Sequence, residues 1–444
     1  MKGHSGLIMK QKSNNKLLVD GLVIGAALFS MLFGAGNMIF PPYLGLKSGT
    51  QWFGGFLSYY IADIGLAIVT FLAMIKSGNN KELLKPVGKT CSNLLLFSVI
   101  MCTGPLISLP RTAATTFELS VLPLFPNVNK ILFYILFFVT VLLLCINRSR
   151  VVDIVGKVLT PVLFIGLIYL IIQGILYPSQ ITQSPRVETS VIAEGIEAGY
   201  QSMDVLAAVI FGIIIIFSAK QKGHKTLESQ QKITAIAGAV AGSGLLIVYL
   251  GLTYLGASFS SNFDPNAIQR TDLLTKLIEI LIPGKGGLIF FGTVVMFACL
   301  STAIALASSS AEYFAELTNE KVSYKTFVTI VCIFSGFVSL VGTDIIIKIA
   351  SPILSIIYPP ILTIVLLQFI DKFINKYIYR ISAGVAFFIS VIEVILNQLK
   401  IVDIIPLQRY SLGWLIPTIT ITVISIIICV IIKKTKSKEN IKKI

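Results

Sequence analysis

The sequence contains few charged residues. Asp, Glu, Lys and Arg make up 13% of its 444 residues, whereas 55% of the residues are hydrophobic and the mean hydropathy is +0.87. Soluble domains carry about 25% charged residues, so this composition excludes a soluble globular protein. Apolar runs of about 20 residues, long enough to cross a bilayer as a helix, recur along almost the whole chain. We therefore expect an all-α integral membrane protein.

The sequence also has few residues of the types that build metal centres. It has two histidines, His4 and His224, and six cysteines without paired spacing. A histidine-based metal site or a disulfide framework is therefore not expected. A membrane-embedded enzyme would be expected to show a dense cluster of His or carboxylate residues, and no nucleotide-binding loop of the Walker type is present. We expect no enzyme activity.

Twelve apolar segments divide the chain, which gives about 12 transmembrane helices. They lie at residues 18–42, 52–75, 94–121, 131–147, 153–177, 192–219, 233–257, 286–317, 324–342, 345–370, 380–399 and 411–432. The long loop at 258–285 carries Leu273, Leu274, Leu277 and Ile278 at helical spacing, which predicts an amphipathic helix covering one face.

Basic residues gather in alternate loops and not over the whole surface. Most of the 36 lysines and arginines precede the first span, follow every second span, or lie in the tail after Ile432. The positive-inside rule then places both termini in the cytoplasm of a multi-pass protein of the cell membrane. This distribution explains the net charge of +15 without a nucleic-acid partner. The lysine-rich tail predicts a disordered segment.

The first span is interrupted by the stretch LFGAGNMIFPP, Leu32 to Pro42. Irregular backbone survives at membrane depth only where it is buried or lines a cavity. Gly34 and Gly36 alone could form a packing notch. Together with Asn37 and the Pro41–Pro42 pair, they indicate a discontinuous helix of the kind that binds substrates and ions in transporters.

A second interruption is expected five spans later if the chain contains an inverted repeat. The sixth span reads EGIEAGYQSMDVLAAVIFGIIIIF, with a small and polar first half that ends near Asp204 and a strongly apolar second half. The two breaks then meet near the middle of the membrane, running in opposite directions. This pairing favours a transporter over a channel.

The eighth span offers hydroxyl oxygens in the run FACLSTAIALASSS. Hydroxyls in membrane helices usually bond back to their own backbone, and this alternative stays open for Ser301 and Thr302. Both nevertheless lie one turn from Ala298. Oxygen ligands without several carboxylates suit a monovalent cation better than a divalent one.

Five ionisable residues lie inside the spans and are candidates for function. They are Asp63, Arg111, Glu118, Asp204 and Glu393. We interpret Arg111 and Glu118, two turns apart, as an internal structural pair, and Glu393 as structural. Asp204 either receives a substrate ammonium group or fixes the broken backbone.

The motifs FSMLFGAGNMIFPPYLG, GPLISLPRTA and AGYQSMDVLAA resemble the bacterial branched-chain amino acid:cation symporter family, the BrnQ-type carriers, over essentially the whole chain. The resemblance implies a LeuT-type fold of two inverted five-helix repeats, at 18–177 and 192–370, with two additional helices at 380–432. Residues 1–17 and 433–444 would be cytoplasmic segments. The stretch Gly34–Asn37 is also similar to the unwound first helix of the sodium-coupled LeuT-like transporters.

The resemblance implies a role for each site residue. Ser30, Phe33, Ala298, Ser301 and Thr302 would bind Na⁺, the coupling ion. Ala35 and Gly36 would offer amides to the substrate carboxylate. The whole substrate-binding set would comprise Ala35, Gly36, Asn37, Tyr200, Gln201, Ser202, Met203, Asp204 and Thr302. The implied function is import of leucine, isoleucine and valine by symport with Na⁺ through alternating access. A proton-coupled carrier that uses Asp63 or Asp204 is the alternative.

Overall fold

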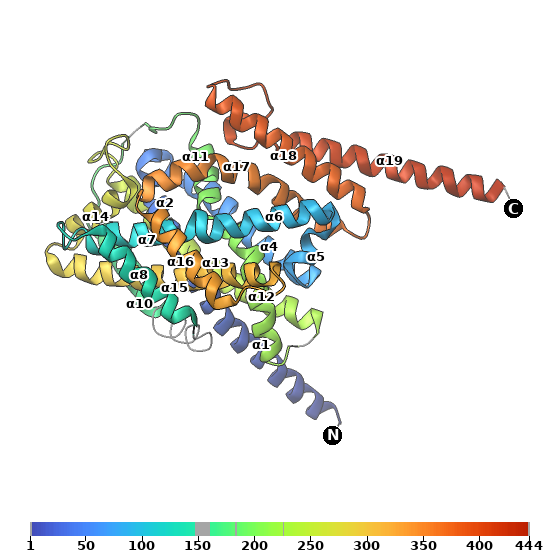
Figure 1. The fold of residues 1–444 in the computed structure, drawn as a ribbon, viewed down its shortest axis with the longest axis horizontal. Coiled ribbons are helices and arrows are strands. Elements are labelled where there is room, and N and C mark those ends of the chain that lie inside the picture. Colours follow the sequence, from blue (N-terminus) through green and yellow to red (C-terminus); the bar gives the residue numbers. More distant parts are fainter. Residues whose placement is uncertain (1, 147–159, 183, 225, 443–444) are drawn as a thin grey trace.

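The computed structural model describes residues 2–146, 160–182, 184–224 and 226–442, and within these ranges every regular element is helical (Figure 1). The first half of the chain contains α1 (Lys2–Leu32), α2 (Ala35–Ser48), α3 (Trp52–Tyr60), α4 (Leu66–Ser77), α5 (Asn80–Leu84), α6 (Lys89–Met101), α7 (Ser108–Thr116), α8 (Lys130–Ile146) and α10 (Thr160–Leu176). The second half contains α11 (Val191–Ser202), α12 (Asp204–Gln221), α13 (Leu227–Ser258), α14 (Arg270–Leu281), α15 (Lys285–Leu317), α16 (Tyr324–Ser339), α17 (Thr343–Leu367), α18 (Lys376–Gln398) and α19 (Leu415–Lys442).

Each of the twelve predicted spans has a helical counterpart, and four of the spans are irregular inside. The first consists of α1 and α2, and the sixth of α11 and α12. A π-helical turn, Ile61–Gly65, joins α3 to α4 in the second span. The third span joins α6 to α7 through Cys102–Leu106, where Gly104 has non-helical backbone angles, and ends in the π-turn Phe117–Val121. The start of the fifth span, before Thr160, lies outside the described residues.

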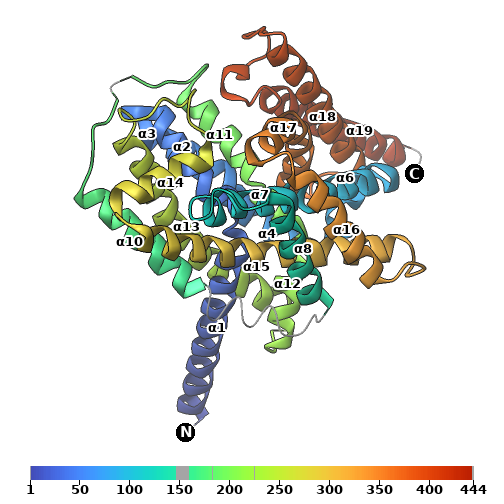
Figure 2. The ribbon, with the colours of Figure 1, turned by 60° about the vertical axis from the view of Figure 1, so that its left-hand side comes forward.

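The broken helices occupy the centre of the bundle. Helices α1 and α2 pack along α13, while α11 packs on α3 and α12 on α4. On another side, α15 packs against α7, α8 and α16. Helix α18 packs against α17, and α19 packs against α18, at the periphery (Figure 2). The two breaks are therefore surrounded by helices and not by lipid.

Two glycines bring α2 and α13 into backbone contact. A Cβ atom built on Gly45 would collide with the carbonyl of Thr253, and one built on Gly256 would collide with the carbonyl of Pro42. Only residues without side chains permit this approach at both positions. The contact makes α2 and α13 a single packing unit.

The amphipathic helix predicted in the long loop is present as α14, and the expected leucines are buried beneath it. Leu273, Leu274 and Leu277 are completely buried and Ile278 is 2% exposed. The helix packs on α2 and α15. It therefore covers the end of the bundle at which α2 terminates.

Two predictions about helix boundaries are wrong. Pro41 and Pro42 lie inside α2 and do not mark the interruption, which is confined to Phe33 and Gly34. Proline is tolerated there because neighbouring groups in a membrane bundle can satisfy the freed carbonyls. The predicted disordered tail after Ile432 instead continues α19 as far as Lys442. Lysine is a good helix former, so an established helix continues into the basic segment.

The loops sort into two groups, as the alternation of charge predicted. At the α14 end, the amide of Thr50 donates to the carbonyl of Thr182 (3.1 Å), and that of Ser261 donates to the carbonyl of Gln180 (3.2 Å). At the opposite end, Lys76 forms an ion pair with Asp371 (2.7 Å). Contacts therefore join loops that were predicted to share a side of the membrane.

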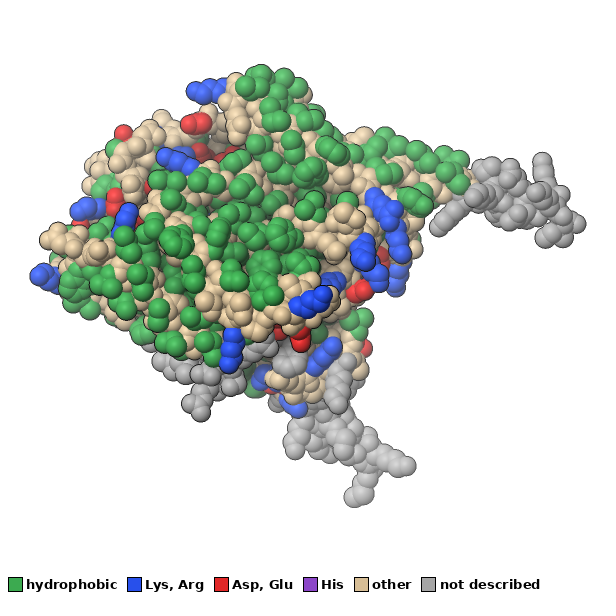
Figure 3. All heavy atoms as spheres, viewed as in Figure 1, with side chains coloured by type: hydrophobic (Ala, Val, Ile, Leu, Met, Phe, Trp, Pro, Cys, Tyr) green, Lys and Arg blue, Asp and Glu red, His purple; other side chains and the backbone are tan. Residues whose placement is uncertain are grey.

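On the face drawn in Figure 3, apolar side chains form a broad surface, with charged side chains gathered mainly toward its edges. Large exposed apolar side chains are frequent on α8, α16 and α18, including Leu136, Phe337 and Phe388. An apolar surface of this extent fits contact with lipid tails.

Candidate substrate and cation site

The first break leaves backbone groups of two helices without their usual partners. Helix α1 ends at Leu32, and the last helical bond runs from the amide of Phe33 to the carbonyl of Phe29 (2.8 Å). Gly34 is extended (φ −114°, ψ −167°), and no side chain caps the start of α2. The final carbonyls of α1, from Ser30 onward, and the first amides of α2 are therefore available to a ligand. Ser30 and Phe33 are buried.

The second break is a single residue. Met203 has left-handed backbone angles (φ 68°, ψ 18°) and separates α11 from α12. This conformation costs a residue with a side chain about 1–2 kcal/mol. A hydrogen bond between the hydroxyls of Tyr59 and Ser202 (2.8 Å) holds the turn from the neighbouring helix. The sequence correctly predicted a break in this segment.

A hydrogen bond joins the two breaks. Nδ2 of Asn37, in the first turn of α2, donates to Oδ2 of Asp204, the first residue of α12, at 2.9 Å. Asn37 also contacts the hydroxyl of Tyr249 on α13. Asp204 therefore contacts the other break through its side chain, and both of its predicted roles stay predictions.

A small cavity of about 20 Å³ lies where the breaks meet. Seven of the nine predicted substrate-binding residues line it: Ala35, Gly36, Asn37, Ser202, Met203, Asp204 and Thr302. The other two, Tyr200 and Gln201, do not line it. The ring of Tyr200 stacks on that of Tyr358, with centroids 4.5 Å apart, and Gln201 lines a separate cavity toward α14. The central cavity holds about one water molecule, so an amino acid can enter only if the helices separate.

The hydroxyls of the predicted cation turn on α15 bond to their own helix. Ser301 Oγ and Thr302 Oγ1 both donate to the carbonyl of Ala298, at 2.8 and 3.2 Å. A hydroxyl that donates its hydrogen retains lone pairs with which to bind a cation. Thr302 also lies against the first break, because a Cβ atom built on Gly34 would be 3.3 Å from Thr302 Cγ2. The turn and the end of α1 thus face each other.

The predicted pairing of Arg111 with Glu118 is wrong. Arg111 Nη1 donates to the backbone carbonyl of Gln201 (2.6 Å), whereas Glu118 Oε1 accepts from the amide of Thr343 at the start of α17 (3.0 Å). Two helical turns separate the residues by about 11 Å. Helical side chains also lean toward the N-terminus, which points Arg111 away from Glu118.

Asp63 lies in the π-turn between α3 and α4 and is completely buried. Neither of its carboxylate oxygens has a hydrogen-bond partner among the described residues. It interacts electrostatically with Asp204 across the second break. Glu393 has the expected structural role, because Oε1 accepts from the amide of Gly413 (3.0 Å) and holds the loop between α18 and α19.

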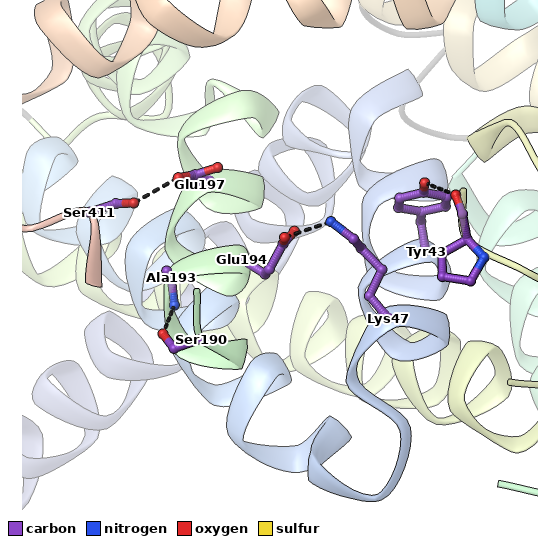
Figure 4. A network of polar contacts seen from close by, with 8 residues as sticks. Tyr43, Lys47, Ser190, Ala193, Glu194, Glu197 and Ser411 are labelled. Atoms are coloured by element: carbon purple, nitrogen blue, oxygen red, sulfur yellow. Dashed lines mark hydrogen bonds and ion pairs between the residues drawn. The ribbon is translucent and has the colours of Figure 1, made fainter. Parts of the chain in front are cut away.

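Two larger cavities flank the central one. The α14-side cavity, about 460 Å³, is lined by residues that include Phe40, Lys47, Glu194 and Arg270. Lys47 and Glu194 form an ion pair (2.5 Å), which Figure 4 shows between α2 and α11. Arg270 forms an ion pair with Asp344 (2.7 Å), at the start of α17.

The α5-side cavity, about 820 Å³, is lined by residues from α5, α6, α12 and α15, including Lys81, Ile210 and Glu312. Along α12 the order is Asp204, then Ala207 at the central cavity, then Ile210 at the α5-side cavity. The central site therefore lies between two larger hollows that open toward opposite ends of the bundle.

Sequence reasoning missed the tyrosines around the site. Tyr59, Tyr249 and Tyr358 are completely buried, from three different helices, and surround the breaks. Tyrosine in an apolar span is equally typical of a membrane interface, so no local signal distinguished these three. Only the way in which their helices pack in the structure shows that these tyrosines lie at the site.

Solved structures of membrane transporters share this fold. Mhp1, a nucleobase-cation-symport-1 family transporter, is similar with a TM-score of 0.64 at 14% identity, over 94% of this chain and 93% of that one. A Na⁺-coupled sialic acid symporter has a TM-score of 0.59 at 14% identity (92% and 90% covered). MhsT, solved with L-phenylalanine, has a TM-score of 0.56 at 16% identity (91% and 98%). These similarities show that the chain has a LeuT-type fold.

Sequence relatives narrow the class further. Residues 18–435 match the family model described as branched-chain amino acid transport protein. A protein of Staphylococcus saprophyticus named as a candidate branched-chain amino acid carrier is 34% identical over 440 residues, covering 93% of this chain and 97% of the relative. A like-named protein of Staphylococcus aureus is 34% identical over 442 residues (94% and 98%). The chain therefore belongs to the branched-chain amino acid transport protein family.

Proposed function

We propose that the protein imports leucine, isoleucine and valine into the cell by symport with Na⁺. Family membership supports the substrate class. The observation that carries the mechanism is the meeting of two helix breaks, joined by Asn37 and Asp204, between cavities at opposite ends of the bundle. Half-helix ends at such a point bind charged substrate groups and ions in transporters.

The Na⁺ site lies between the end of α1 and the α15 turn. Helix α1, whose last turn contains Ser30 and which ends just before Phe33, packs on α15, the helix that carries Ala298, Ser301 and Thr302. Thr302 lies against Gly34. A site of carbonyl and hydroxyl oxygens without a carboxylate suits a monovalent cation. Because one part is on a broken helix and the other on α15, bound Na⁺ would favour a closed arrangement of the two.

The substrate side chain is received by apolar residues beside the breaks. Met31, Leu32, Phe211 and Leu306 line the central cavity with the half-helix ends. An apolar pocket distinguishes one methylene group by about 1–3 kcal/mol, so all three branched side chains share the site. Alternating access follows from the size of the cavity, because the bundle must open toward one large hollow at a time.

Proton coupling is the second candidate, and Asp63 is the observation that favours it. Asp63 is a buried carboxylate that has no hydrogen-bond partner in the described part of the chain and lies near the carboxylate of Asp204. Such a pair is costly unless a positive charge joins it. The discriminating experiment is leucine uptake into proteoliposomes with a Na⁺ or an H⁺ gradient imposed separately. Uptake driven by Na⁺ alone, and retained in Asp63→Asn, supports Na⁺ symport. Uptake driven only by H⁺, and lost in Asp63→Asn, contradicts it.

The proposed location is the cell membrane, with both termini in the cytoplasm. Lys76 and Lys81 lie at the end where α4 leaves the bundle, and both form ion pairs with carboxylates of that same end, Asp371 and Glu316. The concentration of lysines at this end supports its placement inside. The α14 end then faces outward, and the α14-side cavity is the route of entry.

A further inference from the structure

Arg111 is the largest completely enclosed side chain of the protein's described core, with 2% exposure. A guanidinium group carries five N–H donors. Nη1 donates to the carbonyl of Gln201, while Nε has no partner among the described residues. Among the described residues, the carboxylates of Asp204 and Asp63 act on the group electrostatically without forming an ion pair with it. A buried cation with unused donors is costly unless a ligand satisfies it.

Other unsatisfied polar atoms surround this guanidinium. The side-chain oxygen of Gln201 and the hydroxyl of Tyr358 are buried without hydrogen-bond partners in the described structure. Tyr358 lies close to Arg111. Isolated buried groups of this kind are rare in native proteins, and several together need an explanation.

The guanidinium also lies beside the uncapped start of α2. A Cβ atom built on Gly36 would be 2.9 Å from Arg111 Nη2, so the absence of a side chain there lets the arginine approach. The N-terminus of a helix carries a partial positive charge and unpaired amides. A cation placed against this end is unfavourable by itself. The two positive groups together form a site for an anion.

We propose that Arg111 binds the α-carboxylate of the transported amino acid, together with the first amides of α2. This inference rests on the proposed function, and it replaces backbone amides alone as the carboxylate site. A planar guanidinium matches a carboxylate with two parallel hydrogen bonds, which lysine cannot reproduce. Asp204 also lines the cavity, so its carboxylate is available to the ammonium end of the zwitterion.

Arg111 lies on α7, outside both broken helices, while its backbone partner Gln201 lies on α11. A bound carboxylate would thus connect α2, α7 and α11 at one point. An amino acid lacking that carboxylate would leave the connection open. Binding of the carboxylate would therefore also draw these three helices together around the substrate.

The test compares binding of leucine with that of leucinamide, whose carboxylate is replaced by a neutral amide, and of 3-methylbutylamine, which lacks the group. Affinities are measured on the purified full-length protein in lipid nanodiscs at saturating Na⁺. We expect the wild type to prefer leucine over both analogues by at least about tenfold, since a hydrogen-bonded charge is lost. Arg111→Gln should bind leucine at least about tenfold more weakly while binding leucinamide nearly unchanged. Arg111→Lys should recover only part of the preference.

Arg409→Gln, at an exposed arginine of the loop before α19, is the matched control and should keep the wild-type preference. Gly36→Ala keeps the charge but displaces the guanidinium, so it should also reduce the preference if Arg111→Gln does not fold. A wild-type leucine-to-leucinamide ratio in Arg111→Gln or, where that variant is unfolded, in Gly36→Ala overturns the assignment of Arg111. Failure of the wild type to bind any branched-chain amino acid overturns the proposed function as well.

Discussion

Asn37 and Asp204 are 167 residues apart in the chain, yet Nδ2 of one and Oδ2 of the other are 2.9 Å apart in a buried hydrogen bond. Each lies in the first turn of the half-helix that follows a break. The bond therefore connects the two halves of the molecule at the point where both helices are interrupted. A carboxylate acceptor makes it stronger than a bond between neutral groups.

If this bond holds the breaks together, the effects of removing either partner should overlap. Asn37→Ala and Asp204→Ala should each lower the melting temperature, and the double variant should be little worse than the more damaging single one. The coupling expected between residues in contact is about 0.5–3 kcal/mol. Thermal unfolding of the four proteins in detergent measures it. Strictly additive shifts would mean that the bond contributes nothing.

Gly36→Ala tests whether the first break needs close approach of Arg111. The added Cβ would lie 2.9 Å from Arg111 Nη2 and 3.2 Å from Phe40 Cε2, so the guanidinium must move. We expect leucine uptake to fall at least about tenfold, and the larger Gly36→Leu to abolish uptake while the protein still inserts.

Gly384→Ala is the control for this substitution. Gly384 lies in α18, and a Cβ atom built on it would have no other atom within 4 Å. Alanine at such an open helical position should stabilise the protein by about 0.4–1 kcal/mol. Uptake should stay at the wild-type level. Near-normal uptake in Gly36→Leu would instead indicate that Gly34 and Gly36 serve only helix packing.

The cation site predicts a change in Na⁺ dependence. Ser301→Ala and Thr302→Ala each remove an oxygen that the proposed site uses, so half-maximal uptake should need more Na⁺. Because symport links the two binding equilibria, leucine affinity at limiting Na⁺ should fall as well, with partial rescue at high Na⁺.

Ser309→Ala is the control for the cation site, because Ser309 lines the α5-side cavity, two turns away on the same helix. It should leave the Na⁺ dependence unchanged. Removing a hydroxyl that only bonds to the carbonyl of Ala298 would hardly change the Na⁺ dependence of uptake. Wild-type Na⁺ curves for both Ser301→Ala and Thr302→Ala would show that the ion binds elsewhere.

Orientation can be read from cysteine labelling in intact cells. Single cysteines at Gln180 or Asn262, exposed at the α14 end, should react with an impermeant thiol reagent. A cysteine at Glu228, exposed at the other end, should not. The native Cys91 is exposed and lies at that same inner end, so unmodified protein gives the background. Labelling at Glu228 without permeabilisation would reverse the proposed topology.

The sequence predicted the parts of the fold that depend on local chemistry. Continuous apolar runs located the spans, and the small and polar residues near Gly34 and Met203 located both breaks, because irregular backbone in a membrane requires such residues. The double proline led to a wrong prediction of where the helix is interrupted. The sequence shows that Pro41 and Pro42 lack backbone N–H donors, but it does not show the neighbouring groups that allow both prolines to lie inside α2.

The site was predictable only in part, since its contacts cross between distant helices. Arg111 was noticed as an intramembrane charge, yet spacing along one helix suggested Glu118 as its partner. Its actual contact, the carbonyl of Gln201, is a backbone atom freed by the second break. A backbone carbonyl acceptor of this kind cannot be predicted from the pattern of side chains in the sequence. The same holds for Tyr59, whose hydroxyl meets Ser202 on another helix.

The central cavity, which has room for about one water molecule, has a consequence for the electrical state of the cell. Between the two large hollows the path is filled by packed side chains such as Phe211 and Leu306. A continuous column of water there would let ions leak across the membrane, at about 2.3 kcal/mol per charge for each 100 mV. The packed centre blocks such a leak, so a cell can hold many copies of the protein without discharging its membrane.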